Sequence, residues 1–146
     1  MRSTKKSLII KKSTLPGAGL GLFTKIAFRK GDRIVEYKGR RQPWKEVMHE
    51  DGYNGYLLRL NRTTAINAFP YKKSPGRFAN DASGLARTPG LGNNAEYLIY
   101  ANRCFIEATC AIYKGEEILV NYGKAFWDLQ RKIRSGKDLR RKPKGF

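Results

Sequence analysis

The sequence of 146 residues predicts a mostly β fold with a few short helices. Short runs of β-branched and aromatic residues recur between turn signals, which is the pattern of strands. Segments with helical periodicity are few and short. The length fits one domain, and the apolar fraction of 40% and the charged fraction of 29% are ordinary for a globular protein.

The strand signals fall in eight segments, with a tight polar turn between the fourth and the fifth. Asn61 and Arg62 form this turn, which predicts a hairpin. The predicted strands are residues 7–11, 21–24, 33–37, 55–60, 63–67, 96–100, 104–109 and 117–122.

Helical signals are confined to two places. One is a turn or two at residues 44–49. The other covers residues 125–134, where one side carries Phe126, Leu129, Gln130 and Ile133. Residues 82–93 form a long loop rich in glycine, and such loops are either functional or mobile.

The C-terminal segment differs from the rest of the chain in composition. From Ser135 onward it is basic, is punctuated by Gly and Pro, and lacks apolar periodicity, which is typical of a flexible arm. We therefore expect one folded domain over residues 1–128, followed at residues 129–146 by the end of a helix and the basic arm.

The charge of the chain predicts a polyanionic neighbour. Thirty Lys and Arg residues against 12 acidic ones give a formal net charge of +18. Residues 129–146 hold eight basic residues and one acidic residue, so about +11 remains on the domain itself. Contact with DNA through the basic surface and the tail is therefore expected.

Two cysteines, Cys104 and Cys110, are too few for a disulfide framework, and too few for a four-ligand zinc site unless His49 and a carboxylate join them. The apolar stretch at residues 8–10 is too short for a signal peptide, and no segment reaches membrane-spanning length. We expect a soluble intracellular protein with no membrane contact.

Three segments carry chemistry. The first holds Gly17, Gly19 and Gly21, whose freedom at positive φ lets a ligand approach the backbone. No phosphate-binding fingerprint follows, and a tight turn is the plain reading of this segment alone. The second segment, residues 76–82, is followed after the glycine-rich loop by residues 93–96.

The second segment is rich in asparagine. Asn side chains both donate and accept hydrogen bonds, so they suit an amino-acid ligand, although Asn also shapes turns. The third segment, residues 114–123, has a Tyr beside a Gly with Phe126 and Trp127 close behind. Such aromatics can line a channel for an alkylammonium chain, although they are more often core residues.

In order and content, the three segments resemble the SET family of protein-lysine methyltransferases. They match its Gly-x-Gly opening, its Arg-x-x-Asn stretch with a later Asn, and its Gly-Glu-Glu ending with Tyr-Gly. The resemblance covers residues 7–127 and implies several small sheets, a knot-like threading near the C-terminus and a short C-terminal helix.

The resemblance implies S-adenosylmethionine as methyl donor, no metal, and a protein substrate such as a histone or a nucleosome. It also assigns roles to individual residues of this chain. Tyr122 would be the catalytic residue, and Arg77 and Asn94 would support the site. The cofactor would contact Ala18, Gly19, Leu20, Asn80, Asp81 and Trp127, and the substrate channel would be lined by Tyr37, Tyr56, Val120 and Phe126.

This chain departs from the family pattern in four ways. Asp81 stands where the family usually has His, Ala82 replaces Ser, the loop at residues 82–93 is longer, and the zinc-binding cysteine segments are absent. The family uses the His position mainly through its backbone, so Asp81 leaves the activity in place. Phe126 and Trp127 are then the candidates to complete the lysine channel.

Val120 predicts how many methyl groups are added. The family commonly has an aromatic residue at this place, and the smaller Val120 would leave room for a methylated nitrogen to realign. We therefore expect di- or trimethylated lysine, provided that no other tyrosine, such as Tyr56, Tyr97 or Tyr100, fills the gap.

Two other functions stay open from the sequence. A basic β module that binds nucleic acid would explain the charge and the aromatics, but not the arrangement of Asn80, Asn94 and Tyr122. A catalytically silent SET-like binding domain is disfavoured by the presence of Tyr122. If the source is eukaryotic or viral, the expected location is the nucleus or chromatin, including that of a host cell; otherwise it is the cytoplasm.

Overall fold

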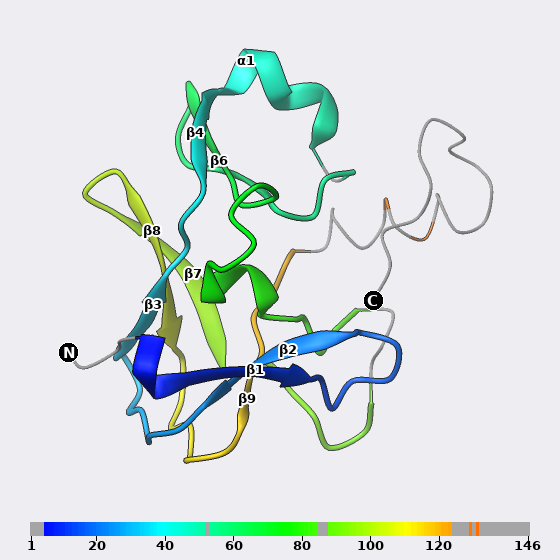
Figure 1. Ribbon diagram of the computed structural model, residues 1–146, viewed down its shortest axis with the longest axis vertical. Helices are drawn as coiled ribbons and strands as arrows, with labels where there is room; N and C mark the ends of the chain where they lie inside the picture. The colour runs from blue at the N-terminus through cyan, green and yellow to red at the C-terminus, as the bar shows by residue number, and fades with distance from the viewer. Residues whose placement is uncertain (1–4, 52, 85–87, 124–128, 130, 132–146) are drawn as a thin grey trace.

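The computed structural model describes residues 5–51, 53–84, 88–123, 129 and 131, and these build three small antiparallel sheets. Figure 1 shows the first sheet at the bottom, the second along one side and the third at the top. The strand orders are β1 (Leu8–Lys12), β2 (Leu20–Thr24), β9 (Glu117–Ile118); β3 (Arg33–Glu36), β8 (Arg103–Ala108), β7 (Ala95–Tyr100); and β4 (Arg40–Pro43), β6 (Thr64–Asn67), β5 (Leu57–Arg59).

The described helices are short, which confirms the predicted fold class. The expected helix at residues 44–49 appears as α1 (Trp44–Val47) followed by the 3-10 turn η2 (Met48–Glu50). Two further 3-10 turns are η1 (Lys5–Ser7) and η3 (Pro75–Phe78). None of the helices in the described part of the chain is long and apolar enough to cross a membrane.

Two apolar clusters join the sheets. Leu22, Ile34, Ile106 and Val120 are fully buried in the larger cluster, between the first and second sheets. The smaller cluster, between the second and third sheets, holds Tyr37, Leu60, Ile66, Ala68 and Cys104. Burying one such large side chain stabilises the fold by about 1.5–3 kcal/mol, so these clusters fix how the sheets meet.

The segment at residues 117–120 passes between two distant parts of the chain. Along an extended strand, successive residues direct their backbone polar groups to opposite edges. On one edge Ile118 pairs with Leu22, and Val120 N–H donates to the Asn80 carbonyl at 2.8 Å. On the other edge, the Leu119 carbonyl accepts from Ala95 N–H at 3.0 Å. The strand therefore lies between the two ends of the loop over residues 80–95, in keeping with the predicted threading.

Candidate active site

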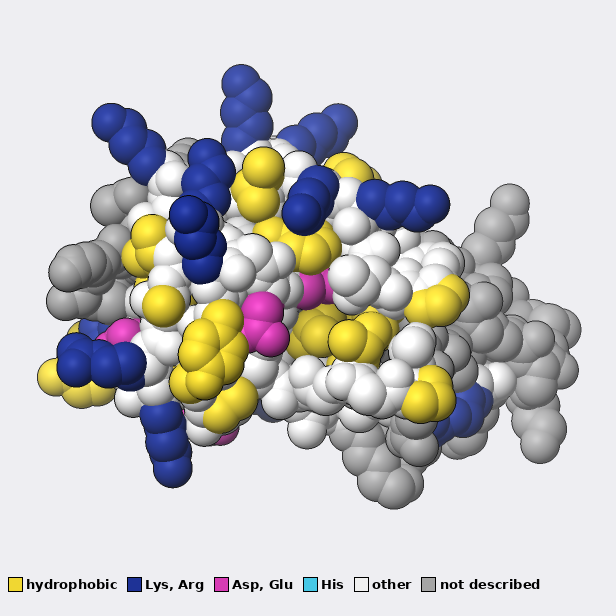
Figure 2. All heavy atoms as spheres, turned by 90° about the horizontal axis from the view of Figure 1, so that it is seen from below, with side chains coloured by type: hydrophobic (Ala, Val, Ile, Leu, Met, Phe, Trp, Pro, Cys, Tyr) yellow, Lys and Arg dark blue, Asp and Glu magenta, His cyan; other side chains and the backbone are white. Residues whose placement is uncertain are grey.

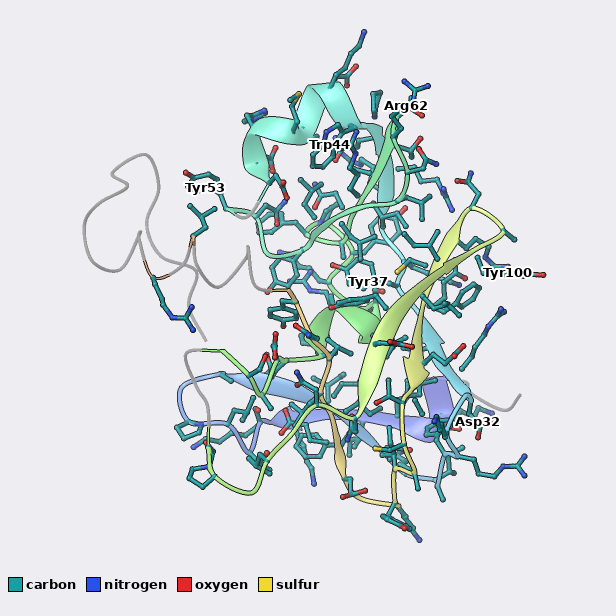
Figure 3. The ribbon with its side chains drawn as sticks, turned by 180° about the vertical axis from the view of Figure 1, so that it is seen from behind. Asp32, Tyr37, Trp44, Tyr53, Arg62 and Tyr100 are labelled. Carbon is teal, nitrogen blue, oxygen red and sulfur yellow. The ribbon has the colours of Figure 1, made fainter. Side chains whose placement is uncertain are left out.

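A pocket of about 420 Å³ lies where the second and third sheets meet residues near the C-terminus. Its aromatic walls are Tyr37, Tyr97 and Tyr122, and Figure 3 shows Tyr37 at the centre of the molecule. The other lining residues are Asp51, Asn54, Gly55, Leu57, Leu58, Arg59 and Leu129. A pocket that combines aromatic walls with polar side chains such as Asp51 and Asn54 suits a long side chain that ends in an amine.

Tyr122 is held at both its backbone and its hydroxyl. Its N–H donates to Asp81 Oδ2 at 2.7 Å, and its hydroxyl donates to the Ala79 carbonyl at 2.5 Å. Burial raises the pKa of Tyr122 well above its usual range, helped by the nearby Tyr37 and Asp81. The phenol therefore stays protonated at any physiological pH and cannot serve as a general base.

Tyr37 and Tyr97 form the rest of the aromatic wall. Their rings meet edge to face, with centroids 5.7 Å apart and planes at 87°. The Tyr37 hydroxyl donates to the Tyr56 carbonyl at 2.7 Å. Burial raises the pKa of both Tyr37 and Tyr97, so the wall is made of neutral phenols.

Tyr56 contributes to this wall through its carbonyl, which accepts from the Tyr37 hydroxyl. The Arg77 guanidinium lies 4.1 Å from the centroid of the Tyr56 ring. The same guanidinium donates to the carbonyls of Ala68 and Phe69, at 3.1 and 2.8 Å. Arg77 therefore fixes the turn beneath the wall, and the Tyr56 ring is not part of the pocket lining.

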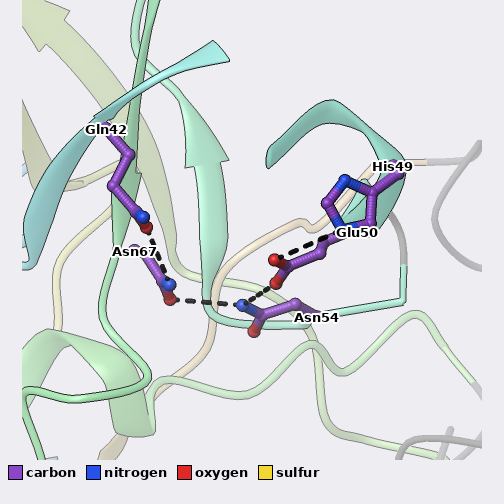
Figure 4. A network of polar contacts seen from close by, with 5 residues as sticks. All are labelled: Gln42, His49, Glu50, Asn54 and Asn67. Atoms are coloured by element: carbon purple, nitrogen blue, oxygen red, sulfur yellow. Dashed lines mark hydrogen bonds and ion pairs between the residues drawn. The ribbon is translucent and has the colours of Figure 1, made fainter. Parts of the chain in front are cut away.

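One wall of the pocket is tied down by a chain of side-chain amides (Figure 4). Asn54 Nδ2 donates to Glu50 Oε1 at 3.1 Å and to Asn67 Oδ1 at 3.2 Å. Asn67 Nδ2 in turn donates to Gln42 Oε1 at 3.0 Å. This network connects the pocket wall at Asn54 to the third sheet.

The predicted cofactor residues of the first two motifs lie together. Gly19 has a φ of +74°, and its carbonyl accepts from Ser13 N–H at 2.8 Å, which closes the turn between β1 and β2. Ala18 is buried in that turn, whereas Leu20 is exposed. Asn80 Nδ2 donates to the Leu20 carbonyl at 3.0 Å, so the two motifs share a hydrogen bond although they are 60 residues apart in sequence.

Glu117 is a further residue of this region that the sequence did not single out. Its side chain is 6% exposed and accepts from Ser13 Oγ at 2.6 Å, from Thr14 N–H at 2.9 Å and from Thr14 Oγ1. Asn80 Nδ2 also donates a long hydrogen bond to Glu117 Oε2, at 3.5 Å. A Cβ on Gly21 would come within 2.3 Å of Glu117 Oε2, so the glycine makes room for the carboxylate.

The side chain of Asp81 makes several hydrogen bonds, in addition to the backbone contact with the cofactor that the family resemblance implies. It is 1% exposed, and its Oδ1 accepts from Ser83 Oγ at 2.6 Å and from Asn93 Nδ2 at 2.8 Å. Its other oxygen holds Tyr122 N–H, as described above. Asp81 thus links the start of the glycine-rich loop to Tyr122, and Asn93 is a second residue that the sequence did not single out.

The remaining predicted residues fall into three groups. Asn94 binds the strand at residues 117–120 through two hydrogen bonds. Its side chain donates to the Glu117 carbonyl and accepts from Leu119 N–H, both at 2.9 Å. Val120 is fully buried in the larger apolar cluster and is not part of the pocket lining. Phe126 and Trp127 lie outside the described residues.

A family model described as "SET domain" matches residues 19–123, which is most of the chain. The matched range includes Tyr122 at the pocket and Asn80 beside the Gly19 turn. The chain is also similar to the histone-lysine N-methyltransferase EZH2 of Chaetomium thermophilum, with 29% identity over 147 residues. The aligned region is 90% of this chain and 9% of that protein. The chain therefore spans a small part of the length of this relative.

Proposed function

Because the chain belongs to the SET-domain family, we propose that it is a protein-lysine methyltransferase that uses S-adenosylmethionine. The match confirms the family that the three sequence motifs indicated. The observation that carries the proposal is Tyr122, held by Asp81 and Ala79 at a pocket walled by three tyrosines.

The residues present fit the proposed cofactor. The Nδ2 group of Asn80 donates to the Leu20 carbonyl, and no donor to its Oδ1 is seen among the described residues. That oxygen is therefore available for the ammonium of an amino-acid ligand. Gly19 and Leu20 are exposed in the turn, and Gly19 has no side chain, so a ligand can approach the backbone there. When bound, S-adenosylmethionine would supply a methyl group from its cationic sulfur.

The pocket would prepare the lysine for methyl transfer. Its aromatic walls exclude water and favour a cationic alkylammonium product. The lysine must arrive as a neutral amine, and Tyr122 stays protonated, so the proton of the lysine must leave to water. Tyr122 then acts as a fixed neutral dipole, and most of the catalysis comes from positioning.

A histone or another chromatin protein is the proposed substrate, which implies a location in the nucleus or on chromatin. The net charge of +18 suits an enzyme that works beside DNA. The similar protein from Chaetomium thermophilum is named as a histone-lysine methyltransferase, which supports this choice of substrate. We expect the basic segment at residues 129–146 to add affinity for DNA.

Labelled S-adenosylmethionine tests the proposal. The protein is incubated with it and with histones, DNA and unrelated proteins, and Tyr122→Phe serves as the matched control. Label on lysine of a histone, lost in the control, supports the proposal. Tight DNA binding with no label on any protein would contradict it and favour the nucleic-acid-binding module.

Truncation after Lys132 tests the role of the basic arm. The shorter protein should keep its activity on a short peptide and lose affinity for DNA, because fewer counterions are released on binding. Both are measured on the same preparation. Loss of peptide activity with unchanged, salt-dependent DNA binding would show instead that the arm is structural.

A further inference from the structure

A cluster of arginines surrounds two neighbouring turns at the end of the molecule opposite the first sheet. We propose that this surface, which we call the arginine tip, binds the phosphate backbone of double-stranded DNA beside the substrate lysine. The proposal rests on the proposed chromatin substrate for its choice of DNA. The arginine tip consists of Arg41, Arg59, Arg62, Arg103 and Lys45, and all five side chains are exposed.

Hydrogen bonds between three elements assemble the tip. Asn61, in the β5–β6 turn, donates to Asn102 Oδ1 in the β7–β8 turn at 2.8 Å. Trp44 N–H donates to the Thr63 carbonyl at 2.8 Å, which brings α1 to the same place. Figure 3 shows Trp44 and Arg62 close together at this end, and Figure 1 shows the turn between β7 and β8 beside β4 and β6.

Two of the guanidinium groups are already held in place. Arg41 Nη2 donates to the Asn102 carbonyl at 2.7 Å. Arg59 donates to the carbonyls of Asn61 and Arg62, at 3.1 and 2.7 Å, and lies 4.5 Å from the centroid of the Trp44 ring. Side chains that are ordered before binding lose less entropy on binding, and arginine matches the geometry of phosphate.

The tip remains positive after its acidic neighbours are counted. Glu36 binds Arg103 through two hydrogen bonds, and the Arg103 guanidinium lowers the pKa of that carboxyl. Glu46, beside Lys45 in α1, is the other nearby carboxylate in sequence. Arg41 in β4, Arg59 in β5 and Arg62 in the β5–β6 turn form no ion pair among the described residues, so they leave positive charge on this surface, which favours a polyanion.

Arg59 connects the tip to the candidate active site, because it also lines the pocket beside Tyr122. A duplex bound at the tip would therefore pass close to the pocket that the proposed function assigns to the lysine. A lysine on a protein segment that lies against DNA meets this requirement. An acidic protein segment is the alternative partner that the experiment must separate from DNA.

The experiment compares two pairs of substitutions that remove equal charge. Arg41→Gln with Arg62→Gln alters the tip, and Lys25→Gln with Lys30→Gln alters exposed residues after β2, at the other end of the molecule. Figure 2 shows that this lower end also carries Lys and Arg side chains, so the second pair is a fair control. Binding of the full chain to a DNA duplex is measured by fluorescence anisotropy at several salt concentrations, without S-adenosylmethionine.

The arginine pair should lower DNA affinity about tenfold and reduce the slope of log K against log salt by about 2, near one unit for each lost phosphate contact. The lysine pair should have a much smaller effect. Equal effects of the two pairs would overturn the proposal, because only net charge would then matter. Stronger competition by an acidic peptide than by DNA would also overturn it.

Methylation assays separate this proposal from the proposed function. The arginine pair should methylate a short peptide as the unchanged protein does, and should lose activity on nucleosomes. If the unchanged protein methylates no peptide, the proposed function fails while the DNA measurement still decides the role of the tip. A loss on peptide equal to the loss on nucleosomes would overturn the assignment of the tip to DNA.

Discussion

At the scale of single residues, two buried carboxylates organise a site in a strongly basic chain. A buried carboxylate is costly unless hydrogen bonds satisfy it. Asp81 accepts from Ser83, Asn93 and Tyr122, and Glu117 accepts from Ser13 and Thr14. Each carboxylate ties one motif to another, so the motifs that are separate in sequence become one site.

Tyr122→Phe should reduce turnover at least about tenfold, equivalent to roughly 1.4 kcal/mol of barrier. The fold should persist, because the change removes the hydroxyl that donates to the Ala79 carbonyl and leaves the contact between Tyr122 N–H and Asp81. Steady-state kinetics with calorimetric titration of the cofactor measures both. Near-normal turnover would remove Tyr122 from its proposed role.

Asn80→Ala should weaken the binding of S-adenosylmethionine, because it removes both the free acceptor and the bond to the Leu20 carbonyl. Calorimetry measures the affinity. Asn61→Ala is the control, since it removes another side-chain amide far from the Gly19 turn. Unchanged affinity in Asn80→Ala would show that the second motif does not meet the cofactor.

At the scale of elements, the strands that the sequence could predict are those with apolar or β-branched residues. Eight of the nine strands in the described part of the chain fall on predicted runs, although β9 ends at Ile118, earlier than expected. The strand β4 was missed, because its residues Arg40–Pro43 carry no apolar pattern. It exists because β6 offers it a free edge, where Pro43 at its end is tolerated.

The roles of Glu117 and Asn93 could not be predicted from the sequence, because they depend on how distant strands and loops pair. The run of two glutamates contains one exposed residue, Glu116, and one buried residue, Glu117. Only the pairing of β9 with β2 decides which of them turns toward Ser13. The sequence likewise does not show which partner each asparagine binds. Asn93 and Asn94 are neighbours, yet Asn93 binds Asp81 and Asn94 binds the Glu117 carbonyl.

The position of β7 bears on the number of methyl groups. Tyr97, in β7, lines the pocket, whereas Val120 lies in the core. We still expect di- or trimethyl-lysine, because Val120 is aliphatic and brings no hydroxyl that could restrict the space beside the lysine nitrogen. Mass spectrometry of a peptide product under excess cofactor decides this. Product that stops at one methyl group would contradict it, and Tyr97→Phe would then test whether the Tyr97 hydroxyl sets the limit.

At the scale of the whole molecule, buried tyrosines set the response to alkaline pH. Burial raises the pKa of Tyr37, Tyr97 and Tyr122. Above about pH 10 the unfolded chain releases these protons while the folded chain keeps them, so the free energy of unfolding falls as the pH rises. Below about pH 10 the three phenols contribute no slope.

The expected loss is about 1.4 kcal/mol per pH unit for each tyrosine that stays protonated in the folded state. Urea denaturation between pH 8 and 11.5, a range chosen around the ordinary phenol pKa of about 10, measures it. Tyr37→Phe removes one titrating group and should give a shallower fall. A stability that stays level to the top of this range would contradict the burial of the phenols.

The passage of residues 117–120 between the two ends of the loop over residues 80–95 has a consequence for folding kinetics. The hairpin of β7 and β8 pairs neighbours in sequence and can form early, whereas the threaded strand must wait for both ends of that loop. Asn80, Asp81 and Tyr122 come together only at that late step. Cofactor affinity should therefore return more slowly than secondary structure when the chain refolds, and species that precede the threading step have no site at all.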